Sequence, residues 1–231
     1  VYNMLKLAID TPLMIKEGVK IGEKANIPEN YSKVKNILIT GLGGSAIGGD
    51  LLRCCLNDEI KVPINVNRNY NLPNWVDENT LVFAISYSGN TEETIEAYKQ
   101  GVAKKAKIIA ITSNGTIKNL SETDGLPYFE VPPGLSPRAA LGYLFFPMLV
   151  ILSKLRLINE KDKDIKETLN VIEDLKKIYL PEVKAKNNPA KQIASKLFAK
   201  PIIVCGVSDF TEVAAVRWKC QFAENSKVFS I

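Results

Sequence analysis

Short apolar runs, each followed by a glycine- or hydroxyl-rich turn and then by a segment with helical spacing, recur along the first part of the chain. Apolar runs rich in β-branched side chains predict strands. We therefore expect strands at Asn36–Thr40, Val62–Val66, Leu81–Ile85, Lys107–Thr112 and Tyr128–Val131. The first, third and fourth runs are apolar throughout, which predicts a parallel sheet with helices on both faces. The predicted fold class is α/β, a doubly wound parallel sheet flanked by helices.

Two segments between these strands have the apolar spacing of helices. They are Ser45–Leu56 and Thr91–Ala103. In the second segment, side chains three and four residues apart share one face of the helix. We expect that face to be buried through Ile95, Tyr98 and Val102.

A third helix is predicted after the last strand. Ser136-Pro137-Arg138 has the composition of a helix start, with Ser at the N-cap and Pro at the first helical position. The apolar run Ala139–Leu152 then predicts a buried helix, because the run is too short to span a bilayer and contains Pro147. We expect no membrane partner. Arg138 near the positive end of a helix is electrostatically unfavourable, which favours a functional role.

The composition changes near residue 155. A strongly charged segment, 159–186, keeps an apolar helical stripe and predicts an amphipathic connecting helix ended by Pro181. The pattern of helix, strand and helix then restarts, with the strand at Ile202–Cys205 and the last helix at Asp209–Glu224. We expect one domain at 1–155 and the start of a second α/β domain at 156–231. The first residue is Val and the last segment has no closing element, so we expect a fragment of a longer protein.

Composition narrows the possible functions. The chain has 30 Lys+Arg and 25 Asp+Glu, a net charge of +5, and the two signs are interspersed, which argues against a nucleic-acid partner. Its 231 residues include no His, so the chain alone cannot form a Ser-His-Asp triad or a His-ligated metal site. The 4 Cys show no CxxC spacing. The segment that starts at the first residue does not have the pattern of a signal peptide. A reduced, cytoplasmic compartment is expected.

A glycine-rich loop, 41–50, follows the first predicted strand and opens a helix. Backbone N–H groups converge at such a position and favour anions. Gly41-x-Gly43-x-x-Ala46 also fits the dinucleotide fingerprint weakly, but the acidic residues about 20 positions on, Asp58 and Glu59, precede the second strand. A nicotinamide-dependent oxidoreductase and a plain tight turn therefore stay open as alternatives.

A second polar loop, Ser86-Tyr-Ser88-Gly-Asn-Thr91, follows the third predicted strand and runs into a helix. Three hydroxyl groups and several N–H groups at a helix N-terminus suit a phosphate monoester. The alternative is a capping box formed by Asn90 and Glu93. If the ends of the two strands face one crevice, Ser45 and the hydroxyls of this loop could share a single phosphate.

These two loops resemble those of sugar isomerase (SIS) domains. More narrowly, the segments 41–50, 137–147 and 217–227 resemble the bifunctional phosphoglucose/phosphomannose isomerase family, in the same order and spacing. The resemblance implies tandem SIS domains with a flavodoxin-like sheet, the second incomplete in this chain. It also implies interconversion of glucose 6-phosphate or mannose 6-phosphate with fructose 6-phosphate through a cis-enediol, no metal and no cofactor, and a homodimer.

The resemblance also assigns roles to residues. Arg138 matches the arginine beside the sugar C1 and C2 oxygens, and Glu224 matches the carboxylate that moves the proton between C2 and C1. The family places a ring-opening His and a Lys downstream of the Glu-Asn motif, and this chain ends at Ile231 before either. A non-catalytic phosphosugar sensor stays open as the alternative. The phosphate ligands implied are Gly44, Ser45, Ser86, Ser88 and Thr91.

Overall fold

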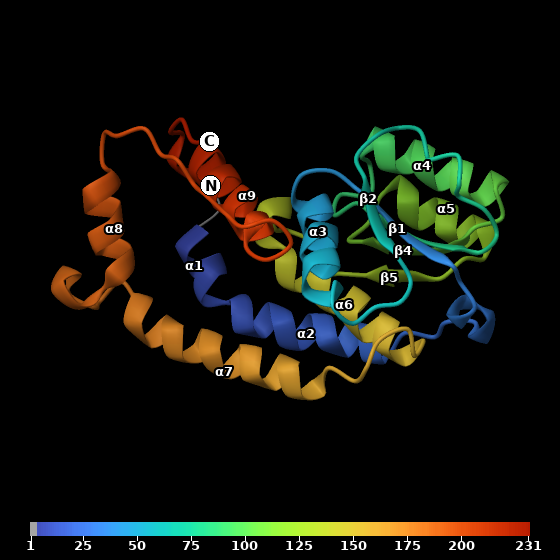
Figure 1. The fold of residues 1–231 in the computed structure, drawn as a ribbon, viewed down its shortest axis with the longest axis horizontal. Coiled ribbons are helices and arrows are strands. Elements are labelled where there is room, and N and C mark those ends of the chain that lie inside the picture. The colour runs from blue at the N-terminus through green and yellow to red at the C-terminus, as the bar shows by residue number, and fades with distance from the viewer. Residues whose placement is uncertain (1–3) are drawn as a thin grey trace. The chain divides into compact units, whose positions relative to one another are not determined.

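The computed structural model describes residues 4–231 and divides into two compact units (Figure 1). One unit is Met14–Glu160, and the other joins the segment ending at Leu13 to Lys161–Ile231. The boundary between the two compact units follows Glu160, close to residue 155, where the sequence predicts the domain boundary. The division into domains 1–155 and 156–231 stays a prediction. No helix within residues 4–231 is both long and apolar enough to cross a membrane.

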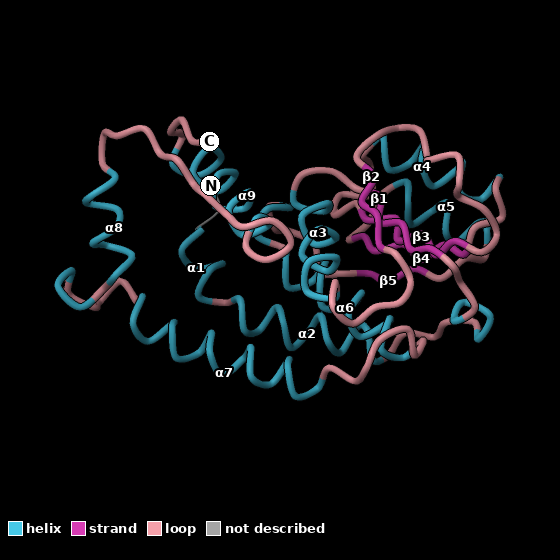
Figure 2. The backbone as a smooth tube through the Cα atoms, in the orientation of Figure 1, coloured by secondary structure: helices cyan, strands magenta, loops and turns pink. Residues whose placement is uncertain are grey.

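A five-stranded sheet is the centre of the unit Met14–Glu160 (Figure 2). All neighbouring strands are parallel, in the order β2-β1-β3-β4-β5, which confirms the predicted α/β class. In register, Ile39 of β1 lies opposite Phe83 of β3, and Phe83 lies opposite Ile109 of β4. The strands are β1 (Asn36–Thr40), β2 (Ile64–Asn67), β3 (Thr80–Ile85), β4 (Lys107–Thr112) and β5 (Tyr128–Glu130).

Helices cover both faces of this sheet, as continuous apolar strands require. α3 contacts β1 and β2, and α4 and α5 contact β3, β4 and β5 on the other side (Figure 1). α2 and α6 pack closely, because a Cβ on Gly18 would lie 2.3 Å from the Gly142 carbonyl oxygen. The helices of this unit are α2 (Thr11–Glu23), which is in it from Met14 on, η1 (Glu29–Ser32), α3 (Gly44–Leu56), α4 (Glu92–Ala103), α5 (Thr116–Asp124), η2 (Pro137–Ala139) and α6 (Leu141–Lys154).

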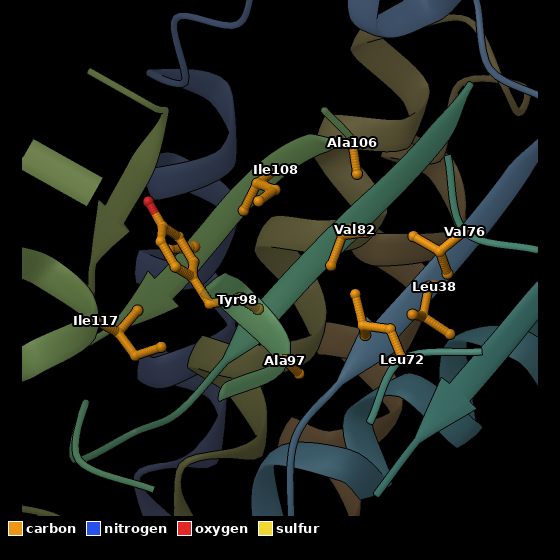
Figure 3. Close-up of a cluster of buried hydrophobic side chains, with 11 residues drawn as sticks. Leu38, Leu72, Val76, Val82, Ala97, Tyr98, Ala106, Ile108 and Ile117 are labelled. Carbon is orange, nitrogen blue, oxygen red and sulfur yellow. The ribbon is translucent and has the colours of Figure 1, made fainter. Parts of the chain in front are cut away.

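The core beneath α4 and α5 shows why the predicted buried face of α4 is partly wrong (Figure 3). Tyr98 is fully buried against Ile108 and Ile117, as expected, but Val102 is 37% exposed. The buried face runs through smaller residues instead, and a Cβ on Gly101 would lie 3.1 Å from the Ile108 side chain. Small residues bring α4 close to the sheet, and this rotates the larger Val102 outward.

The segment before α6 differs from the predicted helix start. Pro137–Ala139 forms a separate 3-10 turn, η2, and the α-helix begins at Leu141. Ser136 makes no side-chain capping hydrogen bond, although Pro does occupy the first turn. Arg138 therefore lies in a tight turn ahead of α6. The apolar run itself is a buried helix, as predicted, with Pro147 inside it.

The other unit is mainly helical. Its elements within residues 4–231 are α1 (Met4–Ile9), α7 (Asp162–Tyr179), η3 (Ala185–Asn187), α8 (Pro189–Leu197), α9 (Glu212–Gln221) and a π-helical turn (Phe222–Ser226). The predicted strand at Ile202–Cys205 is reduced to one parallel bridge between Ile202 and Ser230, because few residues here are placed to pair with it. The predicted helix Asp209–Glu224 is divided between α9 and the π turn.

Thr94 of α4 provides a test of packing in this core. The residue is fully buried, and its hydroxyl oxygen has no hydrogen-bond partner among the described residues. An unsatisfied buried hydroxyl costs about 1–3 kcal/mol. Thr94→Val, which replaces the hydroxyl with a methyl of similar size, should therefore raise the free energy of unfolding by about 1 kcal/mol in urea denaturation. Thr94→Ser, which keeps the hydroxyl and loses the methyl, should lower it; the reverse order would show that the hydroxyl has a partner.

Candidate functional site

The topological switch point of the sheet lies between β1 and β3. The chain leaves β1 into α3 on one face and leaves β3 into α4 on the other. In open α/β sheets this divergence creates a crevice outside the carboxyl ends of the two strands, where ligands bind. The two polar segments singled out in the sequence, 41–50 and 86–91, both start at this point; in the first of them only residues 41–43 form a loop, because α3 begins at Gly44.

Three of the predicted hydroxyl-bearing residues lie at this point. The Ser86 and Thr91 hydroxyl oxygens are 2.9 Å apart, and the Thr91 N–H donates to Ser86 Oγ at 3.4 Å. Ser45, in the first turn of α3, accepts a hydrogen bond at 3.4 Å from the N–H of Tyr87, the residue that follows Ser86. Ser45, which follows β1, is thus linked through the Tyr87 N–H to the loop after β3 that carries the other two hydroxyls. We call Ser45, Ser86 and Thr91 the hydroxyl cluster below.

Ser88 lies apart from this cluster. Its side chain is exposed, and its hydroxyl accepts a hydrogen bond from the Asn90 N–H at 3.3 Å. The loop turns back through Gly89, which has a φ of +73° and a main-chain N–H that donates to the Ser86 carbonyl at 3.0 Å. Ser88 is therefore at the solvent edge of the loop, on the far side of a turn that favours glycine.

The capping-box alternative does not describe Asn90. Its side-chain oxygen accepts hydrogen bonds at 3.0 Å from both the N–H and the hydroxyl of Thr116, at the start of α5. Gly115 permits this contact, because a Cβ there would lie 2.5 Å from the Ser88 carbonyl. The loop after β4 therefore supports the loop after β3. The sequence analysis missed this role, although Asn114-Gly-Thr116, two residues after the end of β4, is a turn signal of the same kind.

Neither helix that opens at the switch point has a side-chain cap. Gly43 is the N-cap residue of α3, and Thr91, the N-cap residue of α4, makes no capping hydrogen bond. First-turn N–H groups lack intrahelical partners and carry the positive end of the helix dipole. The hydroxyl cluster thus lies where two helix N-termini favour a negative charge.

Arg138 is placed beside the cluster through its main chain. A Cβ on Gly44, the first residue of α3, would lie 2.6 Å from the Pro137 carbonyl oxygen and 2.9 Å from the Arg138 nitrogen. The Pro137–Arg138 peptide therefore lies directly against the turn that carries Ser45. Main-chain atoms of residues far apart along the chain are brought together here, and the role of the Arg138 side chain stays a prediction.

Glu224 belongs to the other unit and lies in the π-helical turn that follows α9. Burial lowers the pKa of the nearby Arg217 guanidinium, while the Cys220 and Glu224 side chains raise it. The Glu224 carboxylate is thus within electrostatic reach of a partly buried cation. Single π turns inside helices occur often at functional sites.

Residues 4–231 contain no group of three or more His, Cys, Asp or Glu side chains placed to hold a metal ion. The hydroxyl cluster is neutral, and oxygen ligands without a carboxylate are a weak donor set for a divalent cation. This chemistry suits an anion that accepts hydrogen bonds.

Comparison with known proteins agrees with this geometry. The SIS domain family matches residues 30–121, and the bacterial phospho-glucose isomerase C-terminal SIS domain family matches residues 186–231. The fold is shared with the C-terminal domain of glucosamine-fructose-6-phosphate aminotransferase from Francisella tularensis, with a TM-score of 0.76 at 19% identity over 99% of this chain and 70% of that one. The protein is thus of the SIS-domain class.

Comparison with curated proteins identifies the family more narrowly. The chain is 48% identical over 97% of its length to a bifunctional phosphoglucose/phosphomannose isomerase from Caldicellulosiruptor bescii, and 36% identical over 84% to one from Thermoplasma acidophilum. It spans 66% and 57% of the length of these two relatives. The chain belongs to the bifunctional phosphoglucose/phosphomannose isomerase family.

The contact at Gly44 can be tested by adding one methyl group. Gly44→Ala should displace the Pro137–Arg138 peptide and lower the free energy of unfolding by about 1–3 kcal/mol, the usual cost of overpacking. Gly48→Ala is the matched control on the same helix, because its Cβ would meet nothing closer than 3.7 Å. We expect this control to be neutral or stabilising, since Ala favours helix over Gly. Equal effects in urea denaturation would contradict the close approach.

Proposed function

We propose that this chain carries the phosphate site and two catalytic groups of an aldose–ketose isomerase, which interconverts glucose 6-phosphate or mannose 6-phosphate with fructose 6-phosphate. The observation that carries the proposal is the meeting of Ser45, Ser86 and Thr91 at the switch point, in a chain with 48% identity to such an isomerase. A homodimer and a cytoplasmic location are proposed on the family resemblance. The proposal needs no metal and no redox cofactor.

Phosphate binding is assigned to Gly44, Ser88 and the hydroxyl cluster. Hydroxyl groups and first-turn N–H groups donate hydrogen bonds to the phosphate oxygens, and hydrogen bonds to a charged group are worth about 1.5–3 kcal/mol each. In the structure, the hydroxyls of Ser86 and Thr91 are hydrogen-bonded to each other at 2.9 Å. Each can rotate its proton toward a phosphate without moving the backbone.

Isomerisation moves one proton between C2 and C1 and passes through an enediolate. Glu224 is the proposed base: its carboxylate takes the proton from one carbon and returns it to the other. Arg138 is the proposed cation beside the C1 and C2 oxygens, where it stabilises the negative charge that develops on them. The main chain of Arg138 is fixed against Gly44, which supports a preorganised role.

Ring opening needs a further acid or base. The 231 residues include no His, so a ring-opening His cannot come from them or from a second copy of the same sequence. The assay of turnover therefore uses the protein at its natural length, alongside the 231-residue chain.

Phosphosugar binding is the first test. Fructose 6-phosphate should raise the Tm of the 231-residue chain, because a ligand that binds only the folded state stabilises it. Ser88→Ala should weaken the Kd by about tenfold or more, through the loss of one charged hydrogen bond. Ser32→Ala is the control, since the Ser32 hydroxyl donates at 2.7 Å to the main-chain carbonyl of Glu29 in the short helix η1 and takes no part in the proposed site.

Stabilisation by NAD or NADP in place of the sugar phosphate would support the dinucleotide alternative.

Turnover is the second test. In the protein at its natural length, Glu224→Gln should abolish conversion of fructose 6-phosphate in a coupled assay, because an amide cannot accept the proton. The Kd for fructose 6-phosphate should stay within about twofold of wild type. Glu212→Gln, which removes the same charge from the first turn of α9, controls for the loss of one carboxylate. An active Glu224→Gln variant would rule out this residue as the base, whereas binding without turnover in the wild type would favour a phosphosugar sensor.

A further inference from the structure

Tyr87 connects the loop after β3 to the segment that leads to Arg138. Its side-chain hydroxyl donates a hydrogen bond to the Pro132 carbonyl at 2.7 Å and accepts one from the Leu135 N–H at 2.9 Å. The residue is only 5% exposed. A buried hydroxyl that both donates and accepts has its orientation fixed by its two partners.

The main chain of the same residue contacts two further loops. Its N–H donates to the Ser45 hydroxyl at 3.4 Å, in the turn that opens α3. Its carbonyl accepts from the N–H of Ser113 at 3.0 Å and from the Ser113 hydroxyl at 2.6 Å, in the loop after β4. Tyr87 is thus joined to the loops that follow β1, β4 and β5.

The segment between Leu135 and Arg138 is short and turned. The Ala139 N–H donates to the Ser136 carbonyl at 2.8 Å, which closes the 3-10 turn η2 around Arg138. One end of this segment is bonded to the Tyr87 hydroxyl, and the other lies against Gly44. The position of the Arg138 main chain is therefore determined from two sides.

We propose that Tyr87 is a positioning residue for the isomerisation, whose hydroxyl holds the 132–138 segment so that Arg138 is fixed beside the reacting oxygens. The inference rests on the proposed function. A fixed cation stabilises a developing charge without reorganising during the reaction, so its benefit falls when its support loosens. The phosphate ligands lie outside the 132–138 segment; Ser86 and Ser88 flank Tyr87 along the chain, but the hydrogen bonds made by the Tyr87 main chain do not involve its side-chain hydroxyl. Loss of the Tyr87 hydroxyl therefore lowers kcat and leaves phosphate binding nearly intact.

The test is Tyr87→Phe, which keeps the buried ring and removes only the hydroxyl. In the protein at its natural length we expect kcat to fall about tenfold, the equivalent of about 1.4 kcal/mol, with KM within about twofold of wild type. Hydrogen exchange at the Leu135 N–H should become faster. Tyr31→Phe is the matched control: Tyr31 is 6% exposed, and its hydroxyl donates at 3.3 Å to the Ile108 carbonyl in β4. The control should leave kcat unchanged.

A double-mutant cycle separates positioning from a general loss of stability. In an Arg138→Ala background, Tyr87→Phe should change kcat by less than about twofold, because the group that it positions is gone. A further tenfold loss in that background, or equal kcat values for Tyr87→Phe and Tyr31→Phe, would overturn the inference and leave the proposed function standing. A wild type without turnover, or a fully active Arg138→Ala variant, would instead overturn the proposed function and this inference with it.

Discussion

The contact between Gly44 and the Pro137–Arg138 peptide is the constraint on which the site depends. Main chain can approach the start of α3 this closely because position 44 has no side chain. A similar approach occurs at Gly41, where a Cβ would lie 2.8 Å from the Ile85 carbonyl at the end of β3. The glycines of the first loop therefore serve main-chain packing as well as ligand access. The site is formed where three parts of the chain can be closer than ordinary side chains permit.

The sequence predicted the sheet well where the apolar pattern was unambiguous. β1 and β4 have the predicted bounds, because their apolar runs are continuous and end at polar turns. The predicted bounds of β2 were wrong at both ends: the strand is Ile64–Asn67 and not Val62–Val66. Pro63 cannot donate to a ladder, and the strand extends to Asn67, a buried polar residue whose amide is satisfied by donating to Thr40 Oγ1 at 3.4 Å. A buried polar pair of this kind has no signal in the hydrophobic pattern.

The hydroxyl-bearing residues of the candidate site could be selected from the sequence, but the contacts that hold their loops in place could not. Hydroxyl-rich turns after strands can be read locally, but the adjacency of β1 and β3 depends on the strand order, which no local pattern contains. The bond between Asn90 and Thr116 joins loops after different strands, so it was equally hidden. The strand predicted at Ile202–Cys205 is the opposite case, in which the local pattern was clear but the strand did not form. Its composition favours a strand, yet an extended segment becomes part of a ladder only where neighbours pair with it.

On the proposed function, the two kinds of group in this chain have different kinetic roles. The phosphate of a hexose 6-phosphate is remote from C1 and C2, and its charge does not change along the reaction. Neutral hydroxyls and N–H groups around it therefore bind ground state and transition state alike, and they act on KM. Arg138 and Glu224 would act where charge and protons move, so they act on kcat. A group of the second kind loses its value when it is displaced by about an ångström. This explains why the hydroxyl of Ser88 can lie at the solvent edge of a loop, while the segment that carries Arg138 packs against Gly44 at one end and is bonded to the Tyr87 hydroxyl at Leu135.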